Sequence, residues 1–175
     1  MFKIRRIYDD LLQANQAAVH QVQSIIREQF PLLNQASIDN IPNLIRNPLN
    51  QRFCAILYVA EDHKEVIKGF SLFSHEPKLR VCYLDYISAA KSTTGGGIGG
   101  ALYEHVREEA LSMGVIGIFF ECLPDDPMLC SNPLILKSNK ARLRFYEKYG
   151  ARPIINTGYE TPVKPGGDNP PYLVF

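Results

Sequence analysis

The sequence predicts an α/β fold, in which a mixed, mostly antiparallel sheet is flanked by helices and contains one parallel strand–helix–strand crossover. Two observations predict it. The strand-like runs at residues 52–62 and 66–76 are joined by the short charged turn "EDHKE", which is typical of an antiparallel hairpin. Farther along, the strand-like run 78–90, an amphipathic segment at 98–113 and the apolar run 115–123 follow one another, as in a parallel crossover.

The first fifty residues predict one strand and two helical segments. Residues 2–8, "FKIRRIY", alternate enough to form a first strand. Residues 15–30 carry apolar side chains at helical spacing, and Pro31 ends that helix because proline cannot continue it. The next, polar segment is broken by Pro42 and Pro48, so we expect one short helix there.

The second half of the chain predicts two helices and further strands. The helix at 98–113 is expected to turn three apolar side chains inward: Leu102, Val106 and Leu111. The segments after the apolar run are predicted as a loop, a helix and two strands, at residues 124–135, 138–150, 152–162 and 170–175. Ser138 or Asn139 is expected to cap this later helix, and Gly150 to end it.

Length and composition predict a single domain, residues 1–175, and exclude several classes of protein. A chain of 175 residues with 46% hydrophobic residues can bury a substantial core. A net charge of +1, without a basic run beyond "IRRI", argues against a nucleic-acid partner. No apolar stretch approaches the roughly 20 residues of a membrane span, and the N-terminus lacks a signal-peptide core. We therefore expect a cytoplasmic protein without a membrane partner.

The cysteines predict neither a metal site nor a disulfide framework. The chain has 4 cysteines, mostly in or beside apolar runs, and none of them forms a CxxC pair. Such residues usually behave as small buried hydrophobes. The oligomeric state stays open, a homodimer included.

A glycine cluster at the start of the helix 98–113 is the strongest local signal in the chain. Five glycines are interrupted only by Ile98: Gly95, Gly96, Gly97, Gly99 and Gly100. A helix N-terminus exposes unpaired N–H groups and a partial positive charge, and glycines let an anion approach that backbone closely. The cluster therefore predicts a phosphate-binding loop, with a merely flexible loop as the alternative.

A dinucleotide site is a second interpretation of the same cluster. Gly95, Gly97 and Gly100 satisfy G-x-G-x-x-G, and Glu121 at the end of the next strand would imitate a ribose-binding acid. However, "AAKSTT" separates strand and glycines, and the unit follows an antiparallel hairpin instead of opening the chain. No Lys followed by Ser or Thr stands at the P-loop spacing. The dinucleotide site is therefore the less favoured interpretation.

Two segments resemble the GCN5-related N-acetyltransferase (GNAT) family. "YISAAKSTTGGGIGGALYEHV" is similar to its acetyl-CoA loop, Gln/Arg-x-x-Gly-x-Gly/Ala, with Thr94 at the Gln/Arg place and Gly97-Ile98-Gly99 at the last three. "SNKARLRFYEKYGARPI" resembles a later helix of the family. Its matching residues are Asn139, Phe145, Tyr146 and Gly150. The strand order along nearly the whole chain also fits the fold of this family.

The resemblance implies an N-acetyltransferase that moves the acetyl group of acetyl-CoA, a cosubstrate held without metal, to a primary amine in a ternary complex. Tyr146 would be the general acid that protonates the departing thiolate. A main-chain N–H of the strand would polarise the thioester carbonyl. The residues that would contact acetyl-CoA are Ile87, Ser88, Ala89, Thr94, Gly95, Gly96, Gly97, Ile98, Gly99, Gly100 and Asn139.

Two carboxylates compete for the role of general base. Asp85 stands inside the apolar "CYLDYIS", where an unpaired carboxylate is costly to bury, and Glu121 ends the neighbouring strand. Either could remove a proton from the substrate ammonium directly or through water. Asp85 could equally be a structural partner of an arginine or a backbone N–H. The sequence does not separate these roles.

Tyr146 and Asn139 have structural alternatives too. Ala141, Phe145 and Tyr149 recur every four residues and predict a core face that leaves Tyr146 one step away, as a half-buried packing residue. Asn139 is either a plain helix cap or a cap that also contacts the pantetheine arm.

Two other functions stay open beside acetyl transfer. One is a non-catalytic CoA-binding module of the same fold, and the other is a dinucleotide-binding oxidoreductase. Several loop carboxylates would favour a small cationic amine as the acceptor: Asp125, Asp126, Glu160 and Asp168.

Overall fold

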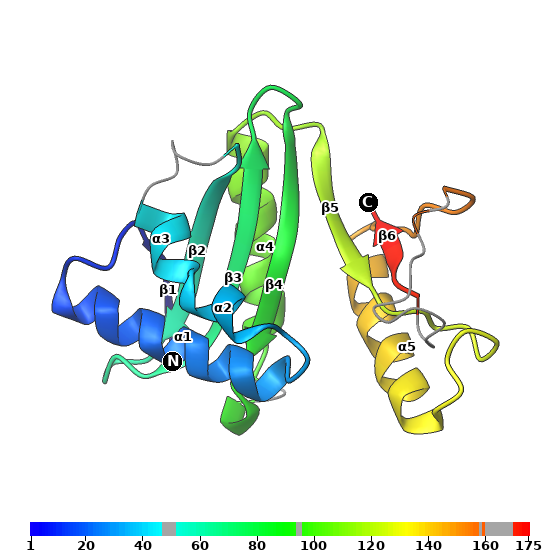
Figure 1. The fold of residues 1–175 in the computed structure, drawn as a ribbon, viewed down its shortest axis with the longest axis horizontal. Coiled ribbons are helices and arrows are strands. Elements are labelled where there is room, and N and C mark those ends of the chain that lie inside the picture. The colour runs from blue at the N-terminus through cyan, green and yellow to red at the C-terminus, as the bar shows by residue number, and fades with distance from the viewer. Residues whose placement is uncertain (47–51, 94–95, 158, 160–169) are drawn as a thin grey trace. The chain divides into compact units, whose positions relative to one another are not determined.

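The structure is a computed structural model of the chain that describes residues 1–46, 52–93, 96–157, 159 and 170–175. The chain divides into two compact units, Met1–Ile118 and Phe119–Phe175 (Figure 1). The predicted glycine loop and Asp85 belong to the first unit. The predicted later helix and Glu121 belong to the second.

The first unit contains four antiparallel strands that lie side by side in chain order. They are β1 (Lys3–Ile7), β2 (Cys54–Glu61), β3 (Ile67–Glu76) and β4 (Val81–Ala89). The predicted β2–β3 hairpin is confirmed. Its turn is organised by Asp62, whose carboxylate accepts hydrogen bonds from the N–H groups of Lys64 and Val66 at 2.8 and 3.1 Å. An Asp that accepts bonds from its own turn supplies the local reason for this reversal.

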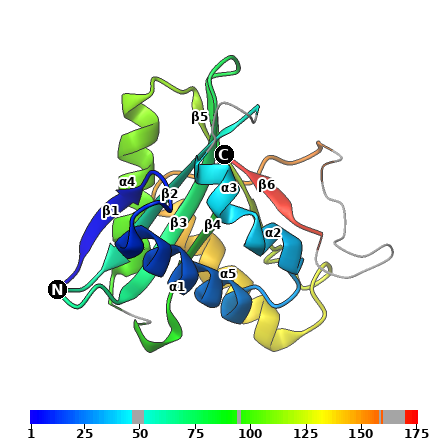
Figure 2. The same cartoon turned by 60° about the vertical axis from the view of Figure 1, so that its left-hand side comes forward.

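Helices cover both faces of these strands (Figure 2). On one face lie α1 (Gln13–Gln29), α2 (Gln35–Asp39) and α3 (Ile41–Arg46), and on the other lies α4 (Ile98–Ser112). The predicted helix at 15–30 is confirmed as α1. The following segment contains two short helices instead of the one expected. Pro42 falls in the first turn of α3, where its missing N–H has no helical partner to lose.

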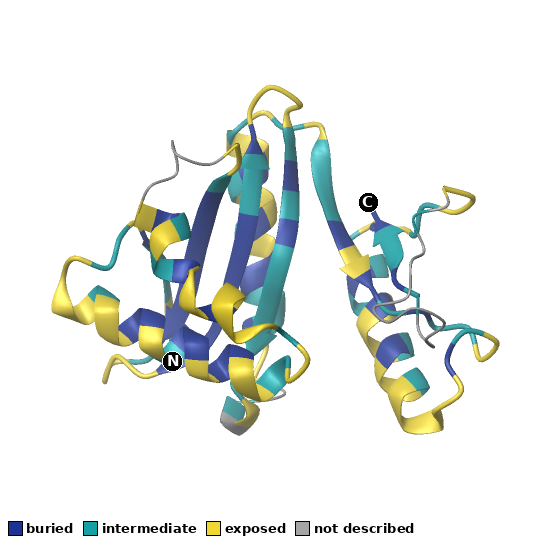
Figure 3. Ribbon diagram, in the orientation of Figure 1, coloured by how far each residue is buried: buried dark blue, intermediate teal, exposed yellow. Residues whose placement is uncertain are grey.

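Apolar side chains fill the layers on both faces, and the middle strands are buried along most of their length (Figure 3). Leu102 and Val106 of α4 are buried, as predicted, whereas Leu111 is 80% exposed. Ala110 takes the inward position instead, because Ile98, Leu102, Val106 and Ala110 repeat every four residues along one side of the helix. The prediction for Leu111 is therefore wrong.

Gly69 of β3 fixes where α4 begins. A Cβ atom at this position would lie 2.8 Å from Cγ2 of Ile98 and 2.8 Å from the carbonyl oxygen of Ser88. Ile98 is the first residue of α4 and is buried. The helix can therefore approach the sheet this closely only because residue 69 has no side chain.

Substitution of Gly69 by Ala is expected to destabilise the protein by about 1–3 kcal/mol, because the added methyl group overpacks the contact between β3 and α4. Chemical denaturation measures the change. Gly99→Ala is the matched control, since a Cβ atom there meets none of the described atoms within 4 Å. Equal stability of the two variants would contradict the role given to Gly69.

The second unit contains β5 (Gly117–Cys122, whose first two residues belong to the first unit), α5 (Pro133–Glu147) and β6 (Tyr172–Val174). β6 pairs antiparallel with β5. The strand predicted at 152–162 is largely wrong over its described part. Pro153 forms only an isolated bridge to Val174, and the backbone at Asn156 has a positive φ of 61°. Arg152 and Ile154 on either side of it still donate hydrogen bonds to Phe175 and Leu173, both at 2.8 Å, so the pairing is limited to these few residues. Residues 158 and 160–162 of the prediction lie outside the described residues.

α5 begins five residues earlier than predicted. Its N-cap is Asn132, whose side-chain oxygen accepts hydrogen bonds from the N–H groups of Leu134 and Ile135, and Pro133 follows at the first helical position. An Asn cap followed by proline is a strong helix start. Ser138 and Asn139 lie inside the helix, so their prediction as caps is wrong. Gly150, with φ of 90°, stands three residues beyond the helix, as its predicted role at the end requires.

Candidate functional site

The connection from β4 to α4 is anchored to the start of β3. After β4 ends at Ala89, the N–H of Ala90 donates to the carbonyl oxygen of Lys68 at 2.8 Å. A short 3₁₀ turn follows at Lys91–Thr93. The Thr93 hydroxyl lies 2.9 Å from the same Lys68 oxygen and 2.8 Å from that of Ala90. These bonds hold the chain in place just before the glycine cluster.

The N-cap residue of α4 is a glycine and supplies no side-chain cap. Gly97 is the N-cap residue, in the left-handed conformation with φ of 74°, and it makes no side-chain cap bond. The Gly96 N–H turns inward and donates to the Thr93 oxygen at 3.3 Å. The N–H groups that follow Gly97 have no partner within a helix. Thr94 and Gly95 lie outside the described residues.

Gly99 and Ile98 occupy opposite environments in this first turn. Ile98 is buried against Gly69, whereas a Cβ atom at Gly99 would meet no described atom within 4 Å. Packing inside the protein therefore does not require a glycine at 99. Absence of side chains at 97, 99 and 100 leaves the backbone of the turn open to a ligand, and a helix N-terminus favours an anion.

Asp85 is the extra residue of a β-bulge in β4. Leu72 of β3 pairs with Tyr86, but the next residue, Phe73, pairs with Leu84, so Asp85 has no partner of its own on β3. A bulge re-aims side chains at the point where it interrupts the ladder. No sequence pattern indicated this one.

The Asp85 carboxylate is held by Ser74, whose hydroxyl donates to Oδ2 at 2.8 Å. Burial raises the pKa of Asp85 from 3.8 to about 6, although the hydrogen bond from Ser74 acts in the opposite direction. No arginine or other charged side chain contributes to this shift among the described residues. The structural alternative with an arginine partner is thus not what the geometry favours.

The three predicted main-chain contacts form the last part of β4. Ile87, Ser88 and Ala89 are half-buried and pair antiparallel with Ser71, Phe70 and Gly69 of β3. This run leads directly from Asp85 to the anchored turn. One continuous segment, residues 85–100, therefore places a carboxylate, strand backbone and the open turn of α4 in succession.

In the second unit, Glu121 lies on β5 and is exposed. Its Oε1 accepts a hydrogen bond of 2.6 Å from the Tyr159 hydroxyl. Asn139 is only 2% exposed, and its Nδ2 donates to the carbonyl oxygen of Pro124 at 2.8 Å. Asn139 thus ties α5 to the segment that follows β5.

Tyr146 belongs to the core face of α5, contrary to the expected helix orientation. It is 6% exposed and packs on Phe120 of β5 with ring centroids 4.4 Å apart. The buried residues of the helix are Asn139, Leu143 and Tyr146, whereas Ala141 is exposed. The predicted face through Ala141 is wrong because the unit buries the neighbouring stripe of the same helix.

Among the predicted loop carboxylates, Asp126 has a local structural role. Asp126 accepts a hydrogen bond from the Met128 N–H at 2.8 Å, and its carbonyl oxygen accepts from Leu129 and Cys130. These bonds build a turn. Glu160 and Asp168 lie outside the described residues.

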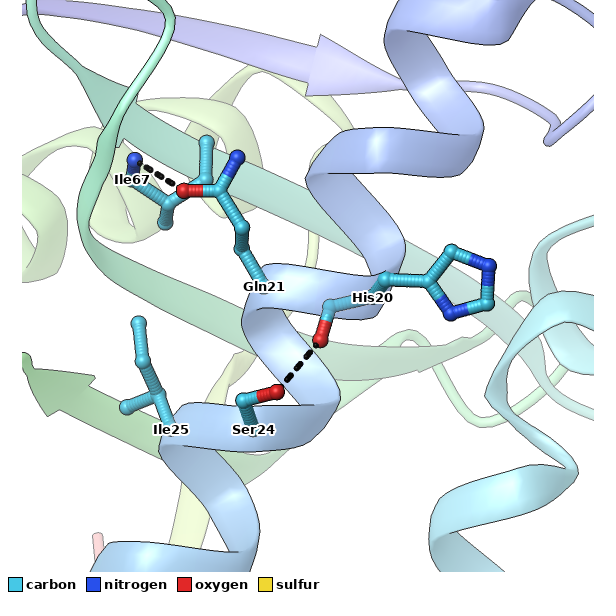
Figure 4. A pocket seen from close by; sticks show the side chains of 5 residues that line it. All are labelled: His20, Gln21, Ser24, Ile25 and Ile67. Carbon is cyan, nitrogen blue, oxygen red and sulfur yellow. Dashed lines mark hydrogen bonds between the residues drawn. The ribbon is translucent and has the colours of Figure 1, made fainter.

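A shallow cavity of about 320 Å³ lies elsewhere in the first unit, between α1 and the start of β3 (Figure 4). Its lining residues are His20, Gln21, Ser24, Ile25 and Ile67. Gln21 accepts a hydrogen bond from the Ile67 N–H and donates to Glu65, and the Ser24 hydroxyl donates to His20. The cavity contains none of the predicted site residues.

Two further observations bear on the kind of chemistry. Among the described residues, no group of three or more His, Cys, Asp or Glu side chains is placed to hold a metal ion. None of the helices in the described ranges has the length and apolar character that crossing a bilayer demands.

Comparison with known proteins connects this geometry to a family. The sequence profile of the Acetyltransferase (GNAT) family matches residues 19–130, which is more than half of the chain. No curated protein matches the sequence.

Solved structures share the fold. An aminoglycoside 6'-N-acetyltransferase in complex with coenzyme A superposes with a TM-score of 0.68 and 18% identity, over 98% of this chain and 94% of its own. The aminoglycoside 6'-N-acetyltransferase from Enterococcus faecium gives 0.68 and 19%, with the same coverage of 98% and 94%. Tetrahymena GCN5 gives 0.66 and 13%, over 99% and 93%. The predicted fold class is thereby confirmed, and by its family profile the chain belongs to the GNAT acetyltransferases.

Proposed function

We propose that the protein is an N-acetyltransferase that transfers the acetyl group of acetyl-CoA to a primary amine, by direct attack in a ternary complex. Residues 1–175 would act as one acyltransferase domain. Membership in the GNAT family supports acetyl transfer. The observation that carries the proposal is the first turn of α4, whose glycine N-cap makes no side-chain bond and which comes after the β4 segment bearing Asp85 in the chain.

The diphosphate of acetyl-CoA would bind at the first turn of α4. The main-chain N–H groups from Gly97 to Gly100 would donate to it, together with the backbone at Thr94 and Gly95. No described atom lies within 4 Å of a Cβ placed at Gly99, which supports this fit because the anion needs the space that a side chain would fill. Gly96 would contribute through its lack of a side chain, since its N–H is already bonded to Thr93.

The main chain of Ile87, Ser88 and Ala89 would pair with the pantetheine arm, and Asn139 would contact it from α5. A main-chain N–H of this strand would stabilise the oxyanion that forms when the amine attacks the thioester carbonyl. Donors fixed in a strand need no reorganisation during the reaction, which is why such groups are effective.

Asp85 is the preferred general base, with Glu121 as the second candidate. Burial raises the pKa of Asp85 to about 6, which still leaves the carboxylate mostly ionised at neutral pH and makes it a stronger proton acceptor than an ordinary carboxylate. Glu121 is exposed and already accepts a hydrogen bond from Tyr159. Asp85 would take the proton from the ammonium group, directly or through water.

Tyr146 would return a proton to the thiolate of CoA. A cysteine-based route through an acyl-enzyme is less favourable, because burial raises the pKa of both Cys82 and Cys122 to about 11 and keeps these thiols protonated. Direct attack by the amine needs no such nucleophile.

Ligand-induced thermal stabilisation and thiol release test the proposal together. We expect CoA and acetyl-CoA, but not NAD(P), to raise the melting temperature of the full chain. We also expect a panel of primary amines, with cationic ones included, to release CoA thiol from acetyl-CoA. Stabilisation without turnover would favour a non-catalytic CoA-binding module, and stabilisation by NAD(P) alone would favour the oxidoreductase.

Tyr146→Phe is expected to lower kcat by about 100-fold or more, since a positioned general acid contributes about 10²–10⁴-fold. Phenylalanine keeps the ring that packs on Phe120, so the fold and the affinity for acetyl-CoA should be retained. Steady-state kinetics measure the effect. Tyr149→Phe makes the same change two residues beyond the end of α5 and should leave kcat unchanged. Full activity of Tyr146→Phe would remove the proposed acid.

A further inference from the structure

Ser74 of β3 is a polar residue that no sequence motif singled out. It pairs with Tyr83 of β4, two residues before Asp85. In a regular antiparallel ladder, side chains two residues apart on neighbouring strands are only diagonal neighbours. The bulge brings the side chains of these two residues closer together, and the Ser74 hydroxyl donates to Oδ2 of Asp85 at 2.8 Å.

The direction of this contact is set by the alternation of β3. Ser74 shares its strand face with Leu72 and Phe70, which belong to the core packed under α1, α2 and α3. Ser71, on the same strand, is fully buried, and its hydroxyl has no hydrogen-bond partner in the part of the chain that the structure describes. Of the two serines, only Ser74 contacts the Asp85 carboxylate.

We propose that Ser74 is a positioning residue for the proposed general base: its hydroxyl holds the Asp85 carboxylate in one orientation at the bulge and favours its ionised form. This inference rests on the proposed function of Asp85. A carboxylate at an interrupted ladder position has lost the neighbours that would fix its rotamer, and a single O–H donor supplies both orientation and charge stabilisation.

Ser74 is the one side chain of the described residues that shifts the pKa of Asp85. The pKa of Asp85 is raised by burial and lowered by the Ser74 hydroxyl and by its own backbone N–H, and no charged group of the described residues acts on it. Removal of the hydroxyl should therefore raise the pKa of Asp85 further. Within the described ranges, no second charge could mask the change.

The test is a carbon-13 NMR titration of the Asp85 carboxyl in the full chain, with Asp85→Asn to assign the signal. We expect Ser74→Ala to raise the pKa of Asp85 by about one unit, the scale of a hydrogen bond to a charged acceptor. Ser74→Thr keeps the hydroxyl and should titrate like the wild type. Ser74→Val, which has the shape of threonine without the hydroxyl, should titrate like Ser74→Ala and serves if the alanine variant folds poorly.

Ser71→Ala is the matched control, because it removes a buried hydroxyl from the same strand without touching Asp85. An unchanged pKa in Ser74→Ala and Ser74→Val, or an equal shift in Ser71→Ala, would overturn the proposal. In Ser74→Ala, the pH at which kcat/KM declines on the acid side of its pH profile should rise together with the pKa of Asp85. An unchanged pH profile would overturn the positioning role. The titration needs no turnover, so an inactive wild type would count against the proposed function and not against the contact.

Discussion

Asp85→Asn is expected to make the protein less active and more stable at the same time. Activity should fall by about 100- to 10,000-fold, the usual contribution of a general base. In the wild type, kcat/KM should decline as the pH drops below about 6, because a protonated Asp85 cannot accept a proton. That acid limb should disappear in the variant.

The gain in stability follows from the direction of the pKa shift. Asp85 has a pKa of 3.8 in its ordinary state and about 6 in the folded protein, so the fold disfavours its charged form. Stability therefore falls as the pH rises from about 4 to about 6, and the full penalty is present above pH 6. Asparagine carries no charge and can still accept the bond from Ser74. We expect the free energy of unfolding at pH 8 to rise by about 1–3 kcal/mol.

Chemical denaturation at pH 4 and pH 8, combined with steady-state kinetics, checks both halves of this prediction. At pH 4 the two proteins should be nearly equal in stability. Glu121→Gln makes the same chemical change at the second candidate and should retain most of the activity. A large loss of kcat in Glu121→Gln with little loss in Asp85→Asn would reverse the assignment of the base.

Gly99→Asp is expected to weaken CoA binding by about 100-fold or more, because two unit charges near 4 Å repel by about 4 kcal/mol at the effective dielectric constant of a protein surface. The substitution should not lower the stability of the protein. The structure has room for a side chain at Gly99, and an acidic residue in the first turn of a helix is favourable. The variant should thus be at least as stable as the wild type.

Isothermal titration calorimetry with CoA, beside thermal unfolding without ligand, measures the two effects separately. Ala14→Asp is the matched control: Ala14 is the second residue of α1, as Gly99 is of α4, and it is exposed. We expect this control to bind CoA like the wild type. Unchanged affinity in Gly99→Asp would mean that the diphosphate does not bind at the first turn of α4.

Local patterns predicted those parts of the fold that local chemistry decides. The hairpin could be predicted because Asp62 and its neighbours form the turn by themselves. The glycine cluster located the start of α4 because Gly97 needs a positive φ that other residues avoid. Membership in the GNAT family followed from the same cluster together with the later helix.

The wrong predictions concern segments in which two alternative sequence patterns are of nearly equal strength. Asn132 with Pro133 and Ser138 with Asn139 are both reasonable helix starts, and the earlier pair has the stronger combination. On α5, two adjacent stripes are apolar enough to face the core, and packing against Phe120 selects the one with Tyr146. The bulge at Asp85 arises from the register between β3 and β4, which the residue pattern of β4 alone does not show.

Because of the bulge, the direction of the Asp85 carboxylate depends on the number of residues in β4. If Leu84 were deleted, the ladder would close without an interruption, and Asp85 would stand opposite Phe73 in the place where Leu84 is now buried. Its carboxylate would then point to the side of the sheet that α4 covers, away from Ser74. Loss of one residue from this strand would therefore remove the proposed proton acceptor while every side chain of the glycine turn stayed the same.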